Sequence, residues 1–257
     1  HIECSAMSLD CLQHKHLGHT LDIHGGGHDL KFPHHENEPA QSEAVSGACF
    51  SNTWMQVGFV QIKQEKMSKS LGNFLTIKDC LKDYHPEVLR YFMLSSHYRS
   101  PVEYSDEAMG AALQGLLRLF SSNKVLEESL KLNGLESRDY NTSLPAQFDE
   151  CLLKYKKDFN NAMADDLNTP VALSVLFDIV KEMNRLTNLA LPVSETALSF
   201  MTNLPIEHTV LDTRLQAASQ LADVLEELGG ILGLLQEKPN TFLIDPRNKK
   251  LNRLADM

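Results

Sequence analysis

The stretch 65-EKMSKSLGNF-74 lies where the pattern of the chain changes, and it decides the predicted fold. Before it, 54-WMQVGFVQI-62 is apolar and rich in β-forming residues, which predicts a buried strand. After it, from about Ile77, apolar residues recur at helical spacing. Lys66 and Lys69 thus stand in a small, hydroxyl-bearing loop, where lysine can neutralise phosphate oxygens in a transition state. An isolated pair of lysines at this spacing is more often a solvated basic loop.

The two sides of this loop predict a mixed α/β part over residues 1–105 and an all-helical part over residues 106–257. In the first part, 20-TLDI-23 predicts a strand that runs into three glycines, and residues 1–7 read as another short strand. Pro86 divides the helical segments around it.

Apolar stripes at helical spacing predict three long helices in the second part, and each stripe indicates core packing. The inward-facing residues are Leu113, Leu116, Leu117 and Phe120; Leu173, Leu176, Phe177, Val180 and Met183; and Leu215, Ala218, Leu221, Leu225 and Leu228. Thr169 is the predicted N-cap of the second helix, with Pro170 at its first helical position. Residues 132–146 and 236–250 are predicted polar connectors.

Composition limits the class of protein. At 257 residues, with 42% hydrophobic and 23% charged residues, the chain is globular. A net charge of −10 argues against a protein that coats DNA, so any nucleic-acid contact must come from local basic patches. Five irregularly placed cysteines suit a reducing cytosol, and no apolar run approaches the roughly 20 residues that cross a bilayer. We therefore expect a cytoplasmic protein.

Metal-binding side chains gather in 31-KFPHHENE-38. If Pro33 opens a helix, His34 and Glu38 stand four residues apart on one face, and His35 points elsewhere. An imidazole and a carboxylate at this spacing can bind one zinc ion. The alternative is a solvated helix start whose glutamates complement the helix dipole.

A second candidate site is 22-DIHGGGHDL-30, where a predicted strand ends in glycines. Gly25, Gly26 and Gly27 would let backbone amides approach ATP closely, and Asp29 could hold the ribose hydroxyls. The pattern is not the dinucleotide GxGxxG fingerprint, and a plain tight turn is the alternative.

The string 66-KMSKS-70 is the signature of class I aminoacyl-tRNA synthetases. Together with 22-DIHGGGHDLKFPHHENE-38 it makes residues 1–74 closely similar to the cysteinyl-tRNA synthetases. The resemblance continues through residues 87–105 and 168–186. It implies the second half of a Rossmann-like catalytic fold with a stem-contact region over the first part of the chain. The second part would then be a helical, tRNA (anticodon)-binding domain that is incomplete at its C-terminus.

The same resemblance implies ATP-dependent activation of cysteine and its transfer to tRNA(Cys), with Mg²⁺ accompanying ATP. In that family one zinc ion per subunit recognises the substrate thiolate, and Cys4, His34 and Glu38 match three of its four ligands. Lys69 matches the ATP-contacting lysine, with Lys66 as the other catalytic lysine of the loop. A monomer that binds neither membranes nor DNA is expected. For Cys4 alone, on its predicted strand, a small buried hydrophobe is the commoner role.

Two pieces of the family pattern are missing. The HIGH motif is absent, since 16-HLGH-19 follows Cys4 and lacks a strand-to-helix setting. The fourth zinc ligand of the family, a cysteine that precedes HIGH, is also absent. Cys11 or Cys49 could substitute for it, but neither lies in a matching position. We therefore expect an internal portion of the enzyme that is inactive without the N-terminal half.

Two other functions fit the same motifs. A cysteine ligase of the mycothiol pathway resembles this family but has no need to bind tRNA, and the long helical part after Ser105 favours the synthetase. A non-catalytic RNA-binding paralogue is the other alternative. If tRNA binds, the expected contacts are basic side chains of the helical part: Lys154, Lys156, Lys157, Arg247, Lys249, Lys250 and Arg253.

Overall fold

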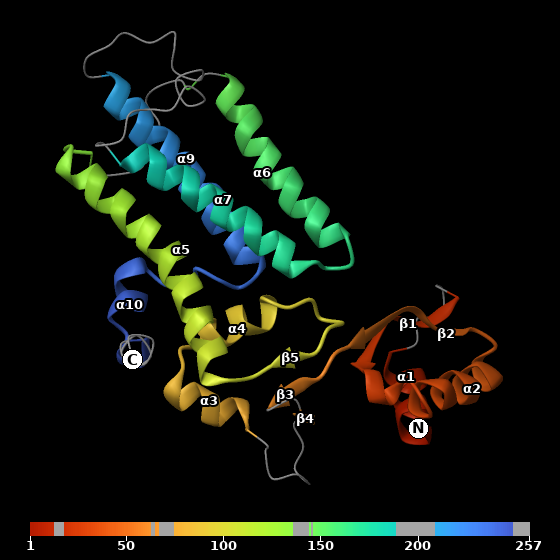
Figure 1. Ribbon diagram of the computed structural model, residues 1–257. Coiled ribbons are helices and arrows are strands. Elements are labelled where there is room, and N and C mark those ends of the chain that lie inside the picture. The colour runs from red at the N-terminus through yellow and green to blue at the C-terminus, as the bar shows by residue number, and fades with distance from the viewer. Residues whose placement is uncertain are drawn as a thin grey trace. The chain divides into compact units, whose positions relative to one another are not determined.

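A computed structural model describes residues 1–12, 18–62, 65–66, 75–135, 144, 146–188 and 209–248. The chain forms two compact units, shown in Figure 1. The first unit contains residues 1–73 and 98–103, and the second contains residues 74–97 and 104–257. Residues 74–97 thus group with the helical bundle, although they precede the boundary predicted near residue 105.

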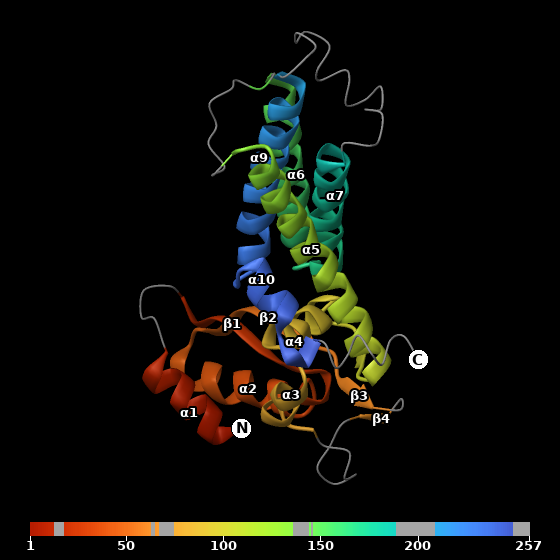
Figure 2. The ribbon, with the colours of Figure 1, turned by 90° about the vertical axis from the view of Figure 1, so that its left-hand side faces the viewer.

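The first unit contains a β–α–β crossover. Strands β1 (His19–Gly27) and β2 (Cys49–Val57) pair in parallel, from His19 opposite Cys49 to Gly27 opposite Val57. Parallel strands need a long connection, which here consists of the 3₁₀ turn η1 (His28–Leu30) and helix α2 (His34–Ser46). Helix α1 (Ile2–Cys11) lies beside α2 (Figures 1 and 2).

Helix α1 replaces the strand predicted for residues 1–7. Apolar residues alternate with polar ones over Ile2, Cys4 and Ala6, which mimics a strand over so short a stretch. Ser5 is the buried residue of this helix, and its neighbours in the sequence are exposed. The prediction of a strand was therefore wrong. A helix that buries one small residue has no apolar residues recurring at helical spacing, so its sequence does not indicate a helix.

Gly58 divides the strand predicted over residues 54–62 into β2 and β3 (Val60–Ile62). Its N–H donates to the carbonyl oxygen of Tyr98 at 2.8 Å. A Cβ atom at Gly58 would lie 2.2 Å from the carbonyl oxygen of Ser100, so only glycine fits there. Strand β3 pairs with β4 (Glu65–Lys66) in antiparallel and with β5 (Val102–Glu103) in parallel orientation. Its residues are half-buried rather than buried, in contrast to the prediction.

The second unit is helical. Its helices are α3 (Ile77–Asp83), α4 (Pro86–Leu94), α5 (Asp106–Leu132), α6 (Ala146–Ala164), α7 (Thr169–Thr187), α9 (Thr209–Ile231) and α10 (Pro239–Ile244). The long helices α5, α6, α7 and α9 run along one another as a bundle (Figures 1 and 2). The three predicted apolar stripes face its core, with Leu117 and Phe177 only half-buried. None of the described helices is long and apolar enough to span a membrane.

Two predicted details of this unit are wrong. Asn168, not Thr169, is the N-cap of α7, because the Asn168 side chain accepts a hydrogen bond from the Val171 N–H. The Thr169 hydroxyl instead donates to the carbonyl oxygen of Leu94 at 2.8 Å. The predicted polar connector 236–250 also contains α10, whose Phe242 is fully buried.

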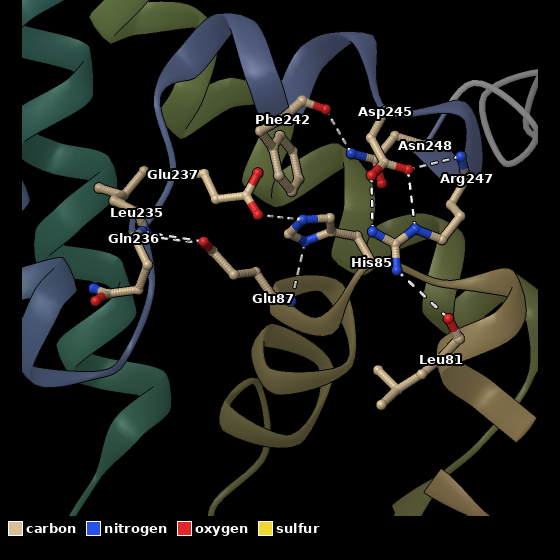
Figure 3. A network of polar contacts seen from close by, with 10 residues as sticks. All are labelled: Leu81, His85, Glu87, Leu235, Gln236, Glu237, Phe242, Asp245, Arg247 and Asn248. Atoms are coloured by element: carbon tan, nitrogen blue, oxygen red, sulfur yellow. Dashed lines mark hydrogen bonds and ion pairs between the residues drawn. The ribbon is translucent and has the colours of Figure 1, made fainter. Parts of the chain in front are cut away.

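The segment after α9 is held to α3 and α4 by a polar network (Figure 3). The buried carboxylate of Glu87 accepts hydrogen bonds from the N–H groups of Leu235 and Gln236, at 2.8 and 3.1 Å. Burial raises the pKa of Glu87, and these two backbone hydrogen bonds oppose that shift. His85 Nδ1 accepts from the Glu87 N–H, while its Nε2 lies 3.3 Å from Glu237 Oε1.

Candidate metal centre

Helix α2 places the predicted imidazole and carboxylate together. Pro33 directly precedes the helix, and His34 and Glu38 follow one turn apart on one face. His34 Nε2 lies 3.0 Å from Glu38 Oε1. Only 1% of the Glu38 side chain is exposed, against 26% for His34. The i, i+4 prediction is confirmed, and it places a buried carboxylate beneath a more accessible imidazole.

Cys4 reaches this pair from α1. Its neighbour Ser5 is buried, and the Ser5 hydroxyl lies 3.4 Å from the backbone oxygen of Glu38 and 3.1 Å from Gln41 Oε1. These contacts fix α1 against α2 at the level of the carboxylate. The ligand atoms of Cys4, His34 and Glu38 all lie within 4.8 Å of one another. The three predicted metal ligands therefore converge, with Cys4 on a helix rather than on the predicted strand.

The donor set fits zinc. Thiolate, imidazole and carboxylate are the side chains that bind Zn²⁺, at about 2.0–2.3 Å from the ion, which separates tetrahedral ligands by roughly 3–4 Å. A buried carboxylate without a cation is costly, and a metal ion would compensate its charge. The exposed Cys4 thiol leaves the site open on its outer side.

Two further histidines surround the same carboxylate. His24 Nε2, from β1, lies 2.9 Å from Glu38 Oε2, and His35 joins these two residues in a second convergent group. His35 is buried and does not point away from the site as predicted. Nothing in the local sequence pattern indicates either contact. The parallel crossover creates both, by bringing the end of β1 alongside the start of α2.

The surroundings of His35 favour its neutral form, because they lower the pKa of its imidazole. Burial is the main cause that lowers its pKa, and repulsion from His24 and His34 adds to it, while the Glu38 carboxylate opposes the shift. Gln56 Nε2 lies 3.1 Å from His35 Nδ1 and fixes the ring from the side of β2.

The predicted ATP-binding glycines occupy the end of β1. A Cβ atom at Gly26 would lie 2.6 Å from His35 Cε1, and one at Gly27 would lie 2.5 Å from Asp29 Oδ1. A Cβ atom at Gly25 would have its nearest neighbour, the Cβ atom of Met55, at 3.8 Å. The absence of a side chain at Gly26 therefore leaves room for the His35 ring. The role of these glycines and Asp29 in ATP binding stays a prediction.

The KMSKS lysines and the HLGH stretch are the remaining features of the predicted site. Lys66 is the last residue of β4, whereas Lys69 lies outside the described residues. In the HLGH stretch, His19 lies on β1 with its Nε2 2.8 Å from Asp22 Oδ1.

Four of the predicted tRNA-contacting side chains lie among the described residues, and they divide into two groups. Lys156 pairs with Glu227 at 2.6 Å, and Arg247 pairs with Asp245 at 2.8 Å, so both have partners within the protein. Lys154 and Lys157 are exposed on α6. Lys249, Lys250 and Arg253 lie outside the described residues.

Comparison with protein families gives two matches. Residues 1–114 match the family described as tRNA synthetases class I (C) catalytic domain. Residues 158–236 match the DALR domain. The first match contains the convergent site, and the second lies within the helical unit.

Comparison with curated proteins gives close relatives. The chain is 45% identical over 243 residues to a cysteine–tRNA ligase of Azotobacter vinelandii, covering 95% of this chain and 42% of that protein. It is 47% identical over 243 residues to a cysteine–tRNA ligase of Thioalkalivibrio sulfidiphilus, covering 95% of this chain and 43% of that protein. The chain thus spans less than half the length of these relatives.

Solved structures show a related fold. The Mycobacterium tuberculosis methionyl-tRNA synthetase in complex with methionyl-adenylate superposes with a TM-score of 0.61 at 20% identity. The match covers 86% of this chain and 43% of that one. At this identity the likeness concerns the fold alone.

Proposed function

Because residues 1–114 match the catalytic domain of class I tRNA synthetases and the chain is similar to cysteine–tRNA ligases, we propose that the protein carrying it activates cysteine with ATP and transfers it to tRNA(Cys). The observation that supports a cysteine substrate most directly is the convergence of Cys4, His34 and Glu38. A site with these three donors suits a metal ion that accepts a soft sulfur ligand.

Zinc would be held by Cys4, His34 and Glu38 together with a fourth ligand. When bound, it would supply a direct bond to the substrate thiolate, which the harder and less acidic hydroxyl of serine replaces poorly at neutral pH. A pocket that discriminates by size alone gains only about 1–3 kcal/mol for such a small difference. The protein's own contribution is to hold the Glu38 carboxylate buried beneath His34 and to bring Cys4 to the same point.

ATP would bind with Mg²⁺ at the end of β1 and at the KMSKS stretch. The backbone of Gly25, Gly26 and Gly27 offers close approach, and Asp29 offers an acceptor for the ribose hydroxyls. Lys69, assisted by Lys66, would neutralise charge on the β- and γ-phosphates as pyrophosphate leaves.

The helical unit would bind tRNA(Cys). Its DALR match and the exposed Lys154 and Lys157 of α6 support this assignment, because an acidic protein must bind nucleic acid through a restricted basic surface. Lys156 and Arg247 are weaker candidates, since each has an acidic partner within the protein. We also propose that the protein is a monomer and is located in the cytoplasm.

The test is cysteine-dependent ATP–pyrophosphate exchange with the full-length protein. Cys4→Ser should lower the zinc content and raise the KM for cysteine. Lys69→Ala should lower kcat by about 10²–10³-fold, because one charge-stabilising donor of the transition state is removed, and should leave the KM for cysteine nearly unchanged.

Cys11→Ser is the matched control, because Cys11 is an exposed thiol on the same helix α1 that belongs to neither convergent group among the described residues. It should retain both zinc and activity. Full zinc occupancy in Cys4→Ser would exclude Cys4 as a ligand. A Lys69→Ala enzyme that keeps kcat but loses affinity for cysteine would contradict the role of that lysine.

A further inference from the structure

We propose that His24 is a positioning residue for Glu38: it donates its Nε2–H to Glu38 Oε2 and thereby directs Oε1 toward the metal. The inference rests on the proposed zinc role of Glu38. It assigns a role to His24, which is not one of the predicted metal ligands, and it gives each oxygen of the Glu38 carboxylate a different role.

The contacts of the carboxylate carry this assignment. Glu38 Oε2 lies 2.9 Å from His24 Nε2, and Glu38 Oε1 lies 3.0 Å from His34 Nε2. An ionised carboxylate is only an acceptor, so the imidazole that faces Oε2 must carry a proton on Nε2. Such a charge-assisted hydrogen bond is stronger than one between neutral groups. It prevents the carboxylate from rotating and exchanging its two oxygens.

The two imidazoles have different roles because of their places in the fold. His34 converges with Cys4, and His24 converges with His35 on the side of β1. Zinc binding needs the Nε2 lone pair of His34. His24 lies on the other side of the carboxylate and can keep its Nε2 proton while zinc is bound. Hydrogen bonds of this kind from outside the ligand set commonly orient carboxylate ligands.

The His24 ring is itself held in place. It follows Ile23 on β1 and lies opposite Trp54 in the β1–β2 register. Its ring centroid lies 4.9 Å from that of Trp54, 5.4 Å from that of Phe50 and 4.9 Å from that of His35. Only 19% of the side chain is exposed. Aromatic packing on several sides therefore holds the ring with its Nε2 facing Glu38.

The experiment measures zinc affinity in the full-length protein by competition with a chromogenic chelator. His24→Phe keeps a ring against Trp54 and Phe50 but removes the donor, and it should weaken zinc binding by about 10–100-fold. His24→Gln places an amide N–H near the position of Nε2 and should restore most of the affinity. His19→Phe is the matched control, because it removes an imidazole of the same strand that faces Asp22 instead.

A second readout separates positioning from a general effect on folding. In the Co²⁺-substituted protein, His24→Phe should change the visible d–d absorption, because Oε1 is no longer held in one orientation, and His24→Gln should return the wild-type spectrum. Wild-type zinc affinity and spectrum in His24→Phe would overturn the inference. So would two metal ions per chain that fall to one in this variant, since His24 would then be a ligand of a second ion.

Cys4→Ser distinguishes this inference from the proposed function. If Cys4→Ser loses zinc and His24→Phe does not, only the role of His24 is wrong. If Cys4→Ser retains zinc at wild-type affinity, the proposed metal site is wrong, and the inference fails with it.

Discussion

At the residue scale, the three glycines at the end of β1 differ in the space around them. Gly25 has room for a side chain, whereas a Cβ atom at Gly26 would meet the His35 ring at 2.6 Å. His35 is buried and held by Gln56, so its ring cannot move away easily. The identity of Gly26 is therefore explained by packing within the protein, before any nucleotide is considered.

This difference predicts the outcome of two matched substitutions. Gly26→Ala should lower the free energy of unfolding by about 1–3 kcal/mol, the usual cost of overpacking. Gly25→Ala should be neutral or stabilise slightly, since alanine restricts the unfolded chain and meets nothing closer than 3.8 Å in the folded one. Chemical denaturation of the metal-free protein measures both. Equal stability of the two variants would show that the His35 ring moves aside without lowering the free energy of unfolding.

The candidate site could be predicted only in part at this scale. The spacing of His34 and Glu38 is local, so the periodicity of a helix was enough to predict their shared face. His24 and His35 join them through the crossover from β1 to α2, and no local period reports such a contact. The expectation that His35 points elsewhere was wrong for this reason.

At the element scale, the sequence pattern did not reveal two of the helices, α1 and α10. Helix α1 buries one small residue and was predicted as a strand, and α10 lies within a segment predicted as a polar connector. Phe242 of α10 stacks on Phe120 of α5 with ring centroids 4.0 Å apart. A single buried aromatic residue in a polar stretch gives no helical periodicity, so the sequence pattern did not indicate α10. Each of the long helices carries several inward-facing apolar residues at helical spacing, and this periodicity was sufficient to predict them.

Arg247 belongs to the structure around α10. Its guanidinium forms hydrogen bonds to both carboxylate oxygens of Asp245, at 3.0 and 2.8 Å, and to the carbonyl oxygen of Leu81 at 3.5 Å (Figure 3). The hydrogen bond from Arg247 is the main cause that holds the pKa of Asp245 below its usual value. This pair joins the segment after α9 to α3, which favours a structural role for Arg247 over contact with tRNA.

We predict that Arg247→Gln lowers the free energy of unfolding by about 1.5–3 kcal/mol at neutral pH, the range for hydrogen bonds to charged groups. Because the folded-state pKa of Asp245 is depressed, its stabilising effect is present above the unfolded-state value of roughly 4. It is lost as the pH falls through the folded-state pKa. The difference between wild type and variant should therefore shrink below pH ~4. A difference that does not change with pH would show that Arg247 acts through its packing alone.

At the scale of the whole molecule, the fold class could be predicted because specific motifs and several independent stripes pointed to the same answer. The family matches over residues 1–114 and 158–236 confirm it. The predicted metal ligands lie in the first unit, and the charges expected to contact tRNA lie in the second. The sequence could not indicate the side chains that support the metal ligands, because those contacts depend on how strands and helices meet.

The central claim is that a metal ion at Cys4, His34 and Glu38 binds the sulfur of the substrate. The most direct measurement is a titration of the Co²⁺-substituted full-length protein with cysteine and, separately, with serine, followed by absorption in the near ultraviolet. Cysteine should strengthen the thiolate-to-cobalt charge-transfer band, because the substrate adds one more sulfur ligand to the site, and serine should leave the band unchanged. Identical spectra with cysteine and serine, or no change with cysteine at saturating concentration, would contradict the claim.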